Sequence, residues 1–193
     1  MDKLARIMSR NSEDTRRRIL EAGTAEFAAH GIAGARVARI AAAAGCNKQL
    51  IYAYFTNKEG LYDAVYDAMV THTVESVPMD PLDLPGYAGS LFDHHRRHPE
   101  FARLTLWFQL ERDPRAGPTP AGLRSVGAKL EAIRDAQDAG AVSTRYAPEE
   151  LLLMILRLSS MAGPGSGEAA YPGRSPEDFR RLLVRAVSQL TGE

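Results

Sequence analysis

Hydrophobic and polar positions between residues 37 and 55 follow the pattern of two short helices joined by a tight turn. From Val37 to Ala44, apolar residues recur at the i, i+3, i+4 and i+7 spacing that places them on one helical face. Gly45 follows, where a helix commonly ends in a left-handed residue without a Cβ atom. Asn47 stands where an N-cap side chain accepts a hydrogen bond from a free backbone amide. This pattern predicts a helix-turn-helix, which makes DNA the first partner to consider.

The same periodicity predicts helices on both sides of this motif. One helix is expected from Ser12 to His30-Gly31, preceded by a flexible N-terminal arm at residues 1–11, and another from the N-cap Asn57 past Val70. Five more are expected over residues 86–98, 100–112, 121–139, 148–162 and 176–191. Because no alternating strand pattern stands out, the predicted fold is all-α with about nine helices.

The distribution of charge supports a nucleic-acid partner although the formal net charge is zero. Residues 1–60 contain ten lysines and arginines against six acidic residues, whereas residues 61–193 contain fourteen against eighteen. The positive excess therefore lies in the same third of the chain as the predicted helix-turn-helix. Such asymmetry is expected when one module binds phosphates and the other does not.

Composition argues against several other classes of protein. A single cysteine excludes an internal disulfide, and no apolar run approaches the roughly 18 residues of a membrane span. The first residues have no apolar core of a secretory signal, so a cytoplasmic protein is predicted. The rival interpretation is an enzyme or an interaction module that carries a helical unit of this kind. Residues 61–193 show no Ser/His/Asp arrangement, P-loop or dinucleotide fingerprint, so neither catalysis nor a cofactor is predicted.

A longer signature surrounds the motif. It consists of Thr15-Arg16, Ile19-Leu20, Ala22, Phe27, His30-Gly31, Val37, Ile40-Ala41, Ala44-Gly45, Ile51-Tyr52, Tyr54-Phe55, Lys58-Glu59 and Leu61. Over about residues 12–65 the chain resembles the TetR family of one-component transcriptional regulators, and the likeness of residues 66–193 is looser. The resemblance implies an N-terminal three-helix DNA-binding domain at residues 12–58. It also implies a helical effector-binding and dimerisation domain at residues 59–193.

The resemblance implies that the helix from Asn47 to Phe55 is the recognition helix. The residues it assigns to DNA contact are Arg36, Lys48, Gln49, Leu50, Tyr52, Ala53, Tyr54 and Lys58. Glutamine can pair with adenine, lysine can donate to guanine, and tyrosine hydroxyls can bind phosphates. Ile51 and Phe55 are expected to anchor the helix on Ile40 and Phe27. Ala35 and Arg36 replace the usual hydroxyl residues that cap the second helix, and Arg36 is expected to contact a phosphate through its charge instead.

Each of these assignments has a plainer alternative. Tyr52 would also suit simple packing, and Lys48 and Gln49 would suit a solvated surface, but the motif favours contact with DNA. Arg16, Arg17 and Arg18 fit a solvated helix face as well as they fit contact with the DNA backbone. Cys46 is interpreted as a small packed thiol and not as a redox switch.

Two groups of side chains in residues 61–193 have the chemistry of possible ligand sites. His94 and His98 lie four residues apart, the spacing of two metal ligands on one helix face, but no nearby Cys or Glu completes a set. Cationic residues before Pro99 also suit a helix C-terminus, so no metal site is predicted. An effector pocket or a plain hydrophobic core would explain the remaining large side chains, namely Tyr87, Phe92, Trp107, Phe108 and Met154.

The helices at 148–162 and 176–191 are more apolar than burial of one face requires, which predicts a homodimer through a four-helix interface. Two symmetric recognition helices would then lie roughly 34–36 Å apart, one turn of DNA. The predicted function is a repressor that binds a palindromic operator on double-stranded DNA and is released by an unknown small-molecule effector. Activation in place of repression stays open.

Overall fold

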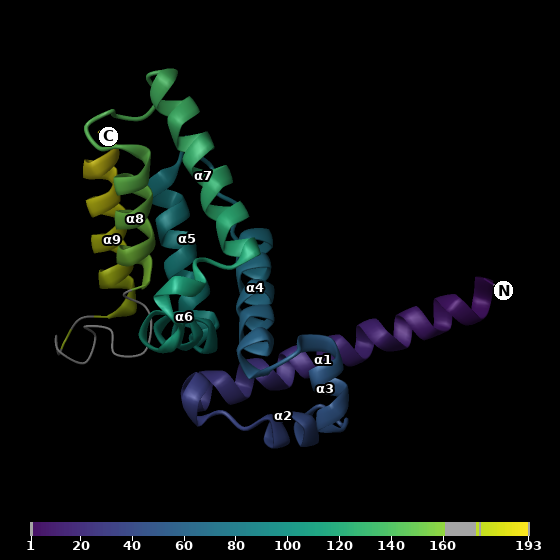
Figure 1. Cartoon of the computed structure of the whole chain (residues 1–193). Coiled ribbons are helices and arrows are strands. Elements are labelled where there is room, and N and C mark those ends of the chain that lie inside the picture. The colour runs from purple at the N-terminus through teal and green to yellow at the C-terminus, as the bar shows by residue number, and fades with distance from the viewer. Residues whose placement is uncertain (1, 161–172, 174, 193) are drawn as a thin grey trace. The chain divides into compact units, whose positions relative to one another are not determined.

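The computed structural model of the chain describes residues 2–160, 173 and 175–192. Within this part there are nine α-helices, one short 3-10 helix at Pro114–Ala116 and no strand, which confirms the predicted all-α class (Figure 1). The helices are α1 (Asp2–Gly34), α2 (Val37–Ala43), α3 (Lys48–Phe55), α4 (Lys58–Ser76), α5 (Leu84–Arg97), α6 (Pro99–Glu111), α7 (Pro120–Asp138), α8 (Pro148–Ser159) and α9 (Pro176–Thr191). None of these helices is both long and apolar enough to cross a membrane.

The first helix differs from the prediction at its start. Its backbone is helical from Asp2, so the expected start near Ser12 is wrong. Residues 2–11 contain neither glycine nor proline, and nothing in their composition interrupts a helix. The predicted end is confirmed in a modified form: Gly31 adopts φ 69° and ψ −177°, which breaks the helix, and helical backbone then resumes up to Gly34.

The helix-turn-helix forms as the pattern predicts. Gly45 has φ +63°, its amide donates to the Ala42 carbonyl at 3.3 Å, and the Cys46 amide donates to the Ala41 carbonyl at 3.0 Å. These two bonds form a Schellman motif, which ends α2. Asn47 Oδ1 accepts from the Leu50 amide at 2.8 Å and so caps α3. The predicted roles of Gly45 and Asn47 are both confirmed.

The connection between α3 and α4 is very short. Thr56 has φ 64° and ψ −54°, and the Asn57 amide donates to the Phe55 carbonyl at 2.6 Å across it. This is a three-residue γ-turn of the strained type, which is unusual for a β-branched residue. Asn57 Oδ1 then accepts from the Gly60 amide at 2.7 Å, which confirms Asn57 as the N-cap of α4.

The chain packs into two compact units, of which the first comprises residues 1–69 and 103–119. Its fully buried side chains come from α1 to α4 and α6, namely Ile19, Phe27, Ile40, Ile51, Leu61, Tyr62, Val65 and Leu104. The ring of Tyr62 meets Phe27 edge-on at 5.0 Å between centroids, and its hydroxyl donates to the Leu104 carbonyl at 2.6 Å. This core holds α2 and α3 against α1.

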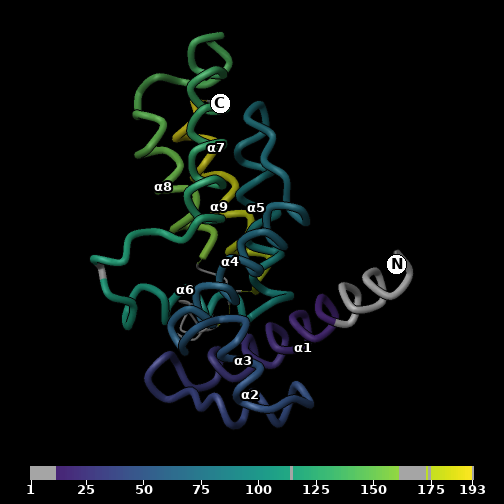
Figure 2. Tube along the Cα trace, turned by 45° about the vertical axis from the view of Figure 1, so that its right-hand side comes forward, coloured from purple at the N-terminus to yellow at the C-terminus, as the bar shows by residue number. Residues whose placement is uncertain are grey.

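The second unit comprises residues 70–102 and 120–193. Within it, α5 packs against both α8 and α9, and α7 packs against α8 (Figures 1 and 2). The core contains Leu84, Tyr87, Ala88, Leu91, Phe92, Ile133, Leu151, Ile155, Leu183 and Val187. The helices from α5 to α9 begin and end within three residues of the predicted positions; α9 has the predicted ends, and α8 ends at Ser159. Residues 161 and 162, where the α8 prediction ended, lie outside the described residues.

Candidate DNA-binding site

The helix α3 has one buried side and one exposed side. Ile51 and Phe55 are 1% and 6% exposed, and both belong to the core, which confirms their predicted burial. Five of the residues assigned to DNA contact are exposed on α3: Lys48, Gln49, Leu50, Tyr52 and Ala53. Among them Tyr52 is 46% exposed although it is aromatic. The exposed side of α3 therefore presents an ammonium group, an amide and a phenol, which suit contact with base edges and phosphates.

The two other tyrosine and lysine positions have partners inside the first unit. The Tyr54 hydroxyl lies 2.7 Å from Ser12 Oγ and 3.3 Å from the Ser12 carbonyl, so it links α3 to α1. Lys58 Nζ donates to the Ala33 carbonyl at 3.3 Å. Both side chains are half-buried. Contact of Tyr54 or Lys58 with DNA stays a prediction, and each has a structural role besides it.

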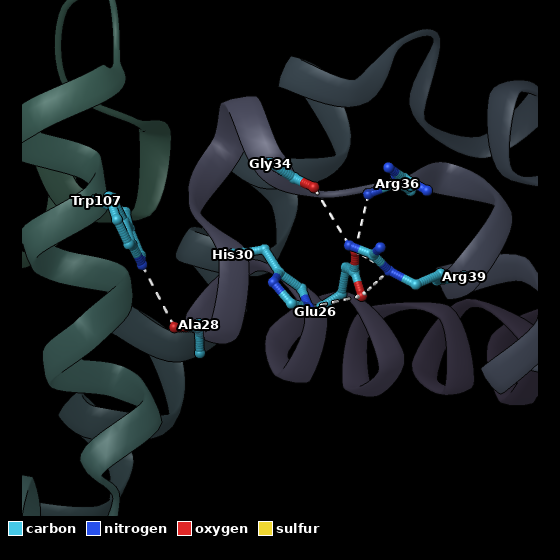
Figure 3. Close-up of polar contacts among 7 residues, drawn as sticks. All are labelled: Glu26, Ala28, His30, Gly34, Arg36, Arg39 and Trp107. Atoms are coloured by element: carbon cyan, nitrogen blue, oxygen red, sulfur yellow. Dashed lines mark hydrogen bonds and ion pairs between the residues drawn. The ribbon is translucent and has the colours of Figure 1, made fainter.

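The start of α2 lacks a capping side chain, as the residues Ala35 and Arg36 suggest. Arg36 is the N-cap residue and makes no side-chain cap hydrogen bond. Glu26 of α1 compensates: its Oε1 accepts from the Arg36 amide at 2.8 Å and from Arg39 Nε at 2.8 Å (Figure 3). Arg39 also donates to the Gly34 carbonyl at 3.2 Å. The Arg36 side chain remains exposed, so it is free of a capping role.

Sequence reasoning missed this carboxylate because Glu26 lies ten and thirteen residues from its partners. Its side chain is only 10% exposed. The hydrogen bond from Arg39 lowers the pKa of Glu26 below its ordinary value, and this effect outweighs burial, which acts in the opposite direction. Glu26 is thus held as an anion next to Arg39. It fixes the first turn of α2 and neutralises one arginine there.

The five large side chains considered for an effector pocket fall into both units. In the first unit, Trp107 Nε1 donates to the Ala28 carbonyl at 3.3 Å, and Phe108 stacks on Tyr66 at 4.1 Å between centroids. In the second unit, Tyr87 and Phe92 are core residues with 4% and 1% exposure. Met154 is half-buried there on α8. Their participation in an effector site stays a prediction.

The histidines of α5 occupy its last turn together with Arg96 and Arg97, which confirms their predicted place at a helix C-terminus. The ring centroids of His72, His94 and His98 lie 4.7 to 5.6 Å apart. His94 is 1% exposed, and burial followed by the neighbouring histidines lowers its pKa to about 4. In the part of the chain that the structure describes, no three His, Cys, Asp or Glu side chains are arranged to hold a metal ion.

Two family models match the chain. The model described as bacterial regulatory proteins of the tetR family matches residues 19–65, which include the helix-turn-helix. The model described as the tetracyclin repressor-like C-terminal domain matches residues 83–189. Together they cover α2 and α3 and nearly all of the helices from α5 to α9.

Individual relatives agree. The chain is 41% identical over 155 residues to the HTH-type transcriptional repressor SCO4008 of Streptomyces coelicolor, a match that covers 80% of this chain and 81% of that protein. A solved structure of SCO4942, a proposed transcriptional regulator of the same organism, is 39% identical with a TM-score of 0.77, over 92% of this chain and 98% of that one. FadR of Bacillus subtilis, solved with stearoyl-CoA, is 16% identical and shares the fold with a TM-score of 0.71, over 91% of this chain and 97% of that one. The chain belongs to the TetR family of transcriptional regulators.

Proposed function

We propose that this protein is a repressor that binds a palindromic operator as a homodimer and is released by a small-molecule effector. The exposed side of α3 carries the proposal. Lys48, Gln49 and Tyr52 project from a helix whose opposite side is anchored in the core, and this is the arrangement with which a recognition helix enters a major groove. Such a function requires access to chromosomal DNA, so a cytoplasmic location is part of the proposal.

Binding to the DNA upstream of the protein's own gene, measured by fluorescence anisotropy at several salt concentrations, tests this function. Affinity should fall steeply with salt, because phosphate contacts release counterions. Replacing Lys48 or Tyr52 by alanine should weaken binding by roughly tenfold or more. Arg124→Ala is the matched control, since it removes one positive charge from an exposed position of α7 in the second unit. Salt-independent binding, or equal affinity of all the variants, would contradict the proposal.

Dimerisation is proposed through α8 and α9. Leu151, Ile155, Leu183 and Val187 on these helices face the core of the second unit, whereas Leu153 and Leu182 are 56% and 43% exposed. Large exposed leucines on two adjacent helices are typical of a surface that a second copy covers. Light scattering should give the mass of a dimer for the unsubstituted protein and of a monomer for a Leu153→Glu, Leu182→Glu variant.

Leu82→Glu serves as the control for that variant, because Leu82 is 66% exposed outside α8 and α9 and should leave the dimer intact. A dimer that persists in the double variant would exclude this interface. For the effector, compounds that raise the melting temperature should be tested for release of the protein from DNA. A ligand can shift DNA affinity only by its differential affinity for the two states of the protein.

A further inference from the structure

The break in α1 leaves two backbone groups without their helical partners. In a continuous helix the Ile32 amide would donate to the Ala28 carbonyl, because α-helical bonds join residues four apart. At Gly31 the backbone turns to φ 69° and ψ −177°, and this bond is lost. Unpaired backbone groups at such a site are costly when they are shielded from water, and the Ile32 side chain is only 8% exposed. Each of the two groups therefore requires another partner.

Both partners come from α6 within the first unit. Trp107 Nε1 donates to the Ala28 carbonyl at 3.3 Å, as Figure 3 shows. One Glu111 carboxylate oxygen accepts from the amides of Ile32 and of Ala33, the latter at 3.0 Å. Trp107 and Glu111 are four residues apart, so they lie on one face of α6. One turn of α6 thus supplies a donor and an acceptor in place of the bond that α1 gives up at Gly31.

The segment that follows the break leads directly into α2. Ala35 is 5% exposed, and its amide donates to the Gly31 carbonyl at 3.2 Å. The residues between the break at Gly31 and the start of α2 are therefore packed and hydrogen-bonded. The path of this segment sets where α2 begins. The Schellman motif at Gly45 and the cap at Asn47 fix α3 relative to α2, so the position of α3 depends on the same segment.

From this geometry we propose that Trp107 and Glu111 are positioning residues for DNA binding. Neither side chain needs to contact DNA. Both hold the backbone around Gly31 in the conformation that sets the positions of α2 and α3. The proposal rests on the proposed function for its readout in DNA affinity, but its structural part is measurable without DNA. Trp107 thereby has a structural role, the hydrogen bond to the Ala28 carbonyl, in addition to its predicted part in an effector pocket.

The sign of the effect separates positioning from simple electrostatics. Glu111 is exposed and negatively charged, so its removal alone should favour binding to a polyanion. A positioning role predicts the opposite, because the recognition helix would lose its defined placement. Since no phosphate contact is lost, the slope of log affinity against log salt should stay unchanged.

The experiment compares Glu111→Ala, Glu111→Gln, Trp107→Phe and the control Leu110→Ala, whose side chain is 74% exposed next to Glu111. Amide hydrogen exchange at Ile32 and Ala33 should be at least roughly tenfold faster in Glu111→Ala. DNA affinity should fall by roughly tenfold in the same variant. Glu111→Gln keeps an acceptor oxygen and should lie between Glu111→Ala and the unsubstituted protein. Leu110→Ala should match the unsubstituted protein in both measurements.

Unchanged exchange at Ile32 and Ala33 in Glu111→Ala would overturn the proposal at its structural step. Faster exchange together with equal or tighter DNA binding would overturn the positioning role. Failure of the unsubstituted protein itself to bind DNA would instead contradict the proposed function, and the positioning role with it, whatever the exchange shows. Trp107→Phe removes the donor and keeps an aromatic ring, so weaker DNA binding with intact overall helicity would support the proposal independently.

Discussion

Replacing Gly31 by alanine should be among the most damaging small substitutions in the first unit. The backbone there has φ 69° and ψ −177°, a region that is essentially restricted to glycine and costs other residues about 1–3 kcal/mol. A Cβ atom at this position would lie 2.9 Å from both Glu111 carboxylate oxygens and 3.1 Å from Trp107 Cδ2. The carboxylate would have to withdraw from the Ile32 and Ala33 amides, which costs roughly 1.5–3 kcal/mol more. We expect the free energy of unfolding to fall by about 3–5 kcal/mol.

Urea denaturation followed by circular dichroism measures this loss, with Gly34→Ala as the matched control. Gly34 has helical backbone, and a Cβ atom there would meet only His30 Cβ, at 3.4 Å. Alanine is a better helix former than glycine, so the control should be neutral or more stable by up to about 1 kcal/mol. A Gly31→Ala protein within about 1 kcal/mol of the control would refute the argument, because neither the backbone strain nor the lost hydrogen bonds would then be real.

Three further outcomes follow from single side chains. Asn47→Ala removes the cap on the Leu50 amide and should lower the free energy of unfolding by about 1 kcal/mol in urea denaturation, whereas Asn47→Asp, which keeps the acceptor, should not. The pKa of the Glu26 carboxylate is lowered, chiefly by the hydrogen bond from Arg39, so the stability that it adds is fully present above about pH 4.5 and is lost as the pH falls through its native pKa. Glu26→Gln should therefore be less stable than the unsubstituted protein at pH 7 in urea denaturation, and the difference should shrink as the pH is lowered below about 4.5. Burial lowers the pKa of His94 to about 4, from 6.5 for an ordinary histidine. Between these two pH values the unfolded chain binds a proton that the folded chain does not. The free energy of unfolding should therefore fall by on the order of 2 kcal/mol as the pH drops from 6.5 to 4. His72, His95, His98 and Arg97 surround it, and thermal unfolding of His94→Gln across this range should show a weaker pH dependence.

The features that could be predicted from the sequence are those with local signals. The apolar spacing from Val37, the glycine at position 45 and the cap at Asn47 all act within a few residues, and the structure confirms each of them. The burial of Ile51 and Phe55 on α3 was implied by the resemblance to the TetR family, and the structure confirms it. Helix ends before prolines were also predictable, because proline cannot continue a helix.

The contacts that the sequence did not reveal join distant residues. Glu26 reaches Arg39 thirteen residues away, and Glu111 reaches Ile32 over 79 residues, so no spacing rule points to either pair. The missing cap at Ala35 and Arg36 was visible, but its replacement by a carboxylate of α1 depends on packing. The start of α1 differs from the prediction for another reason. Residues 1–11 are polar and lack a hydrophobic pattern, which favours an arm, but polarity alone does not prevent helix formation.

The short helix α3 is bounded at both ends by backbone devices, the Asn47 cap and the γ-turn at Thr56. A helix of eight residues is too short to persist by itself, so its existence depends on those ends and on the buried Ile51 and Phe55. The exposed side chains of α3, namely Lys48, Gln49, Leu50, Tyr52 and Ala53, take no part in this support. The exposed residues of α3 can therefore be exchanged during evolution without loss of the helix, because the groups that stabilise α3 are its two ends and its buried side chains. If the proposed function holds, a change of DNA sequence preference need not cost stability.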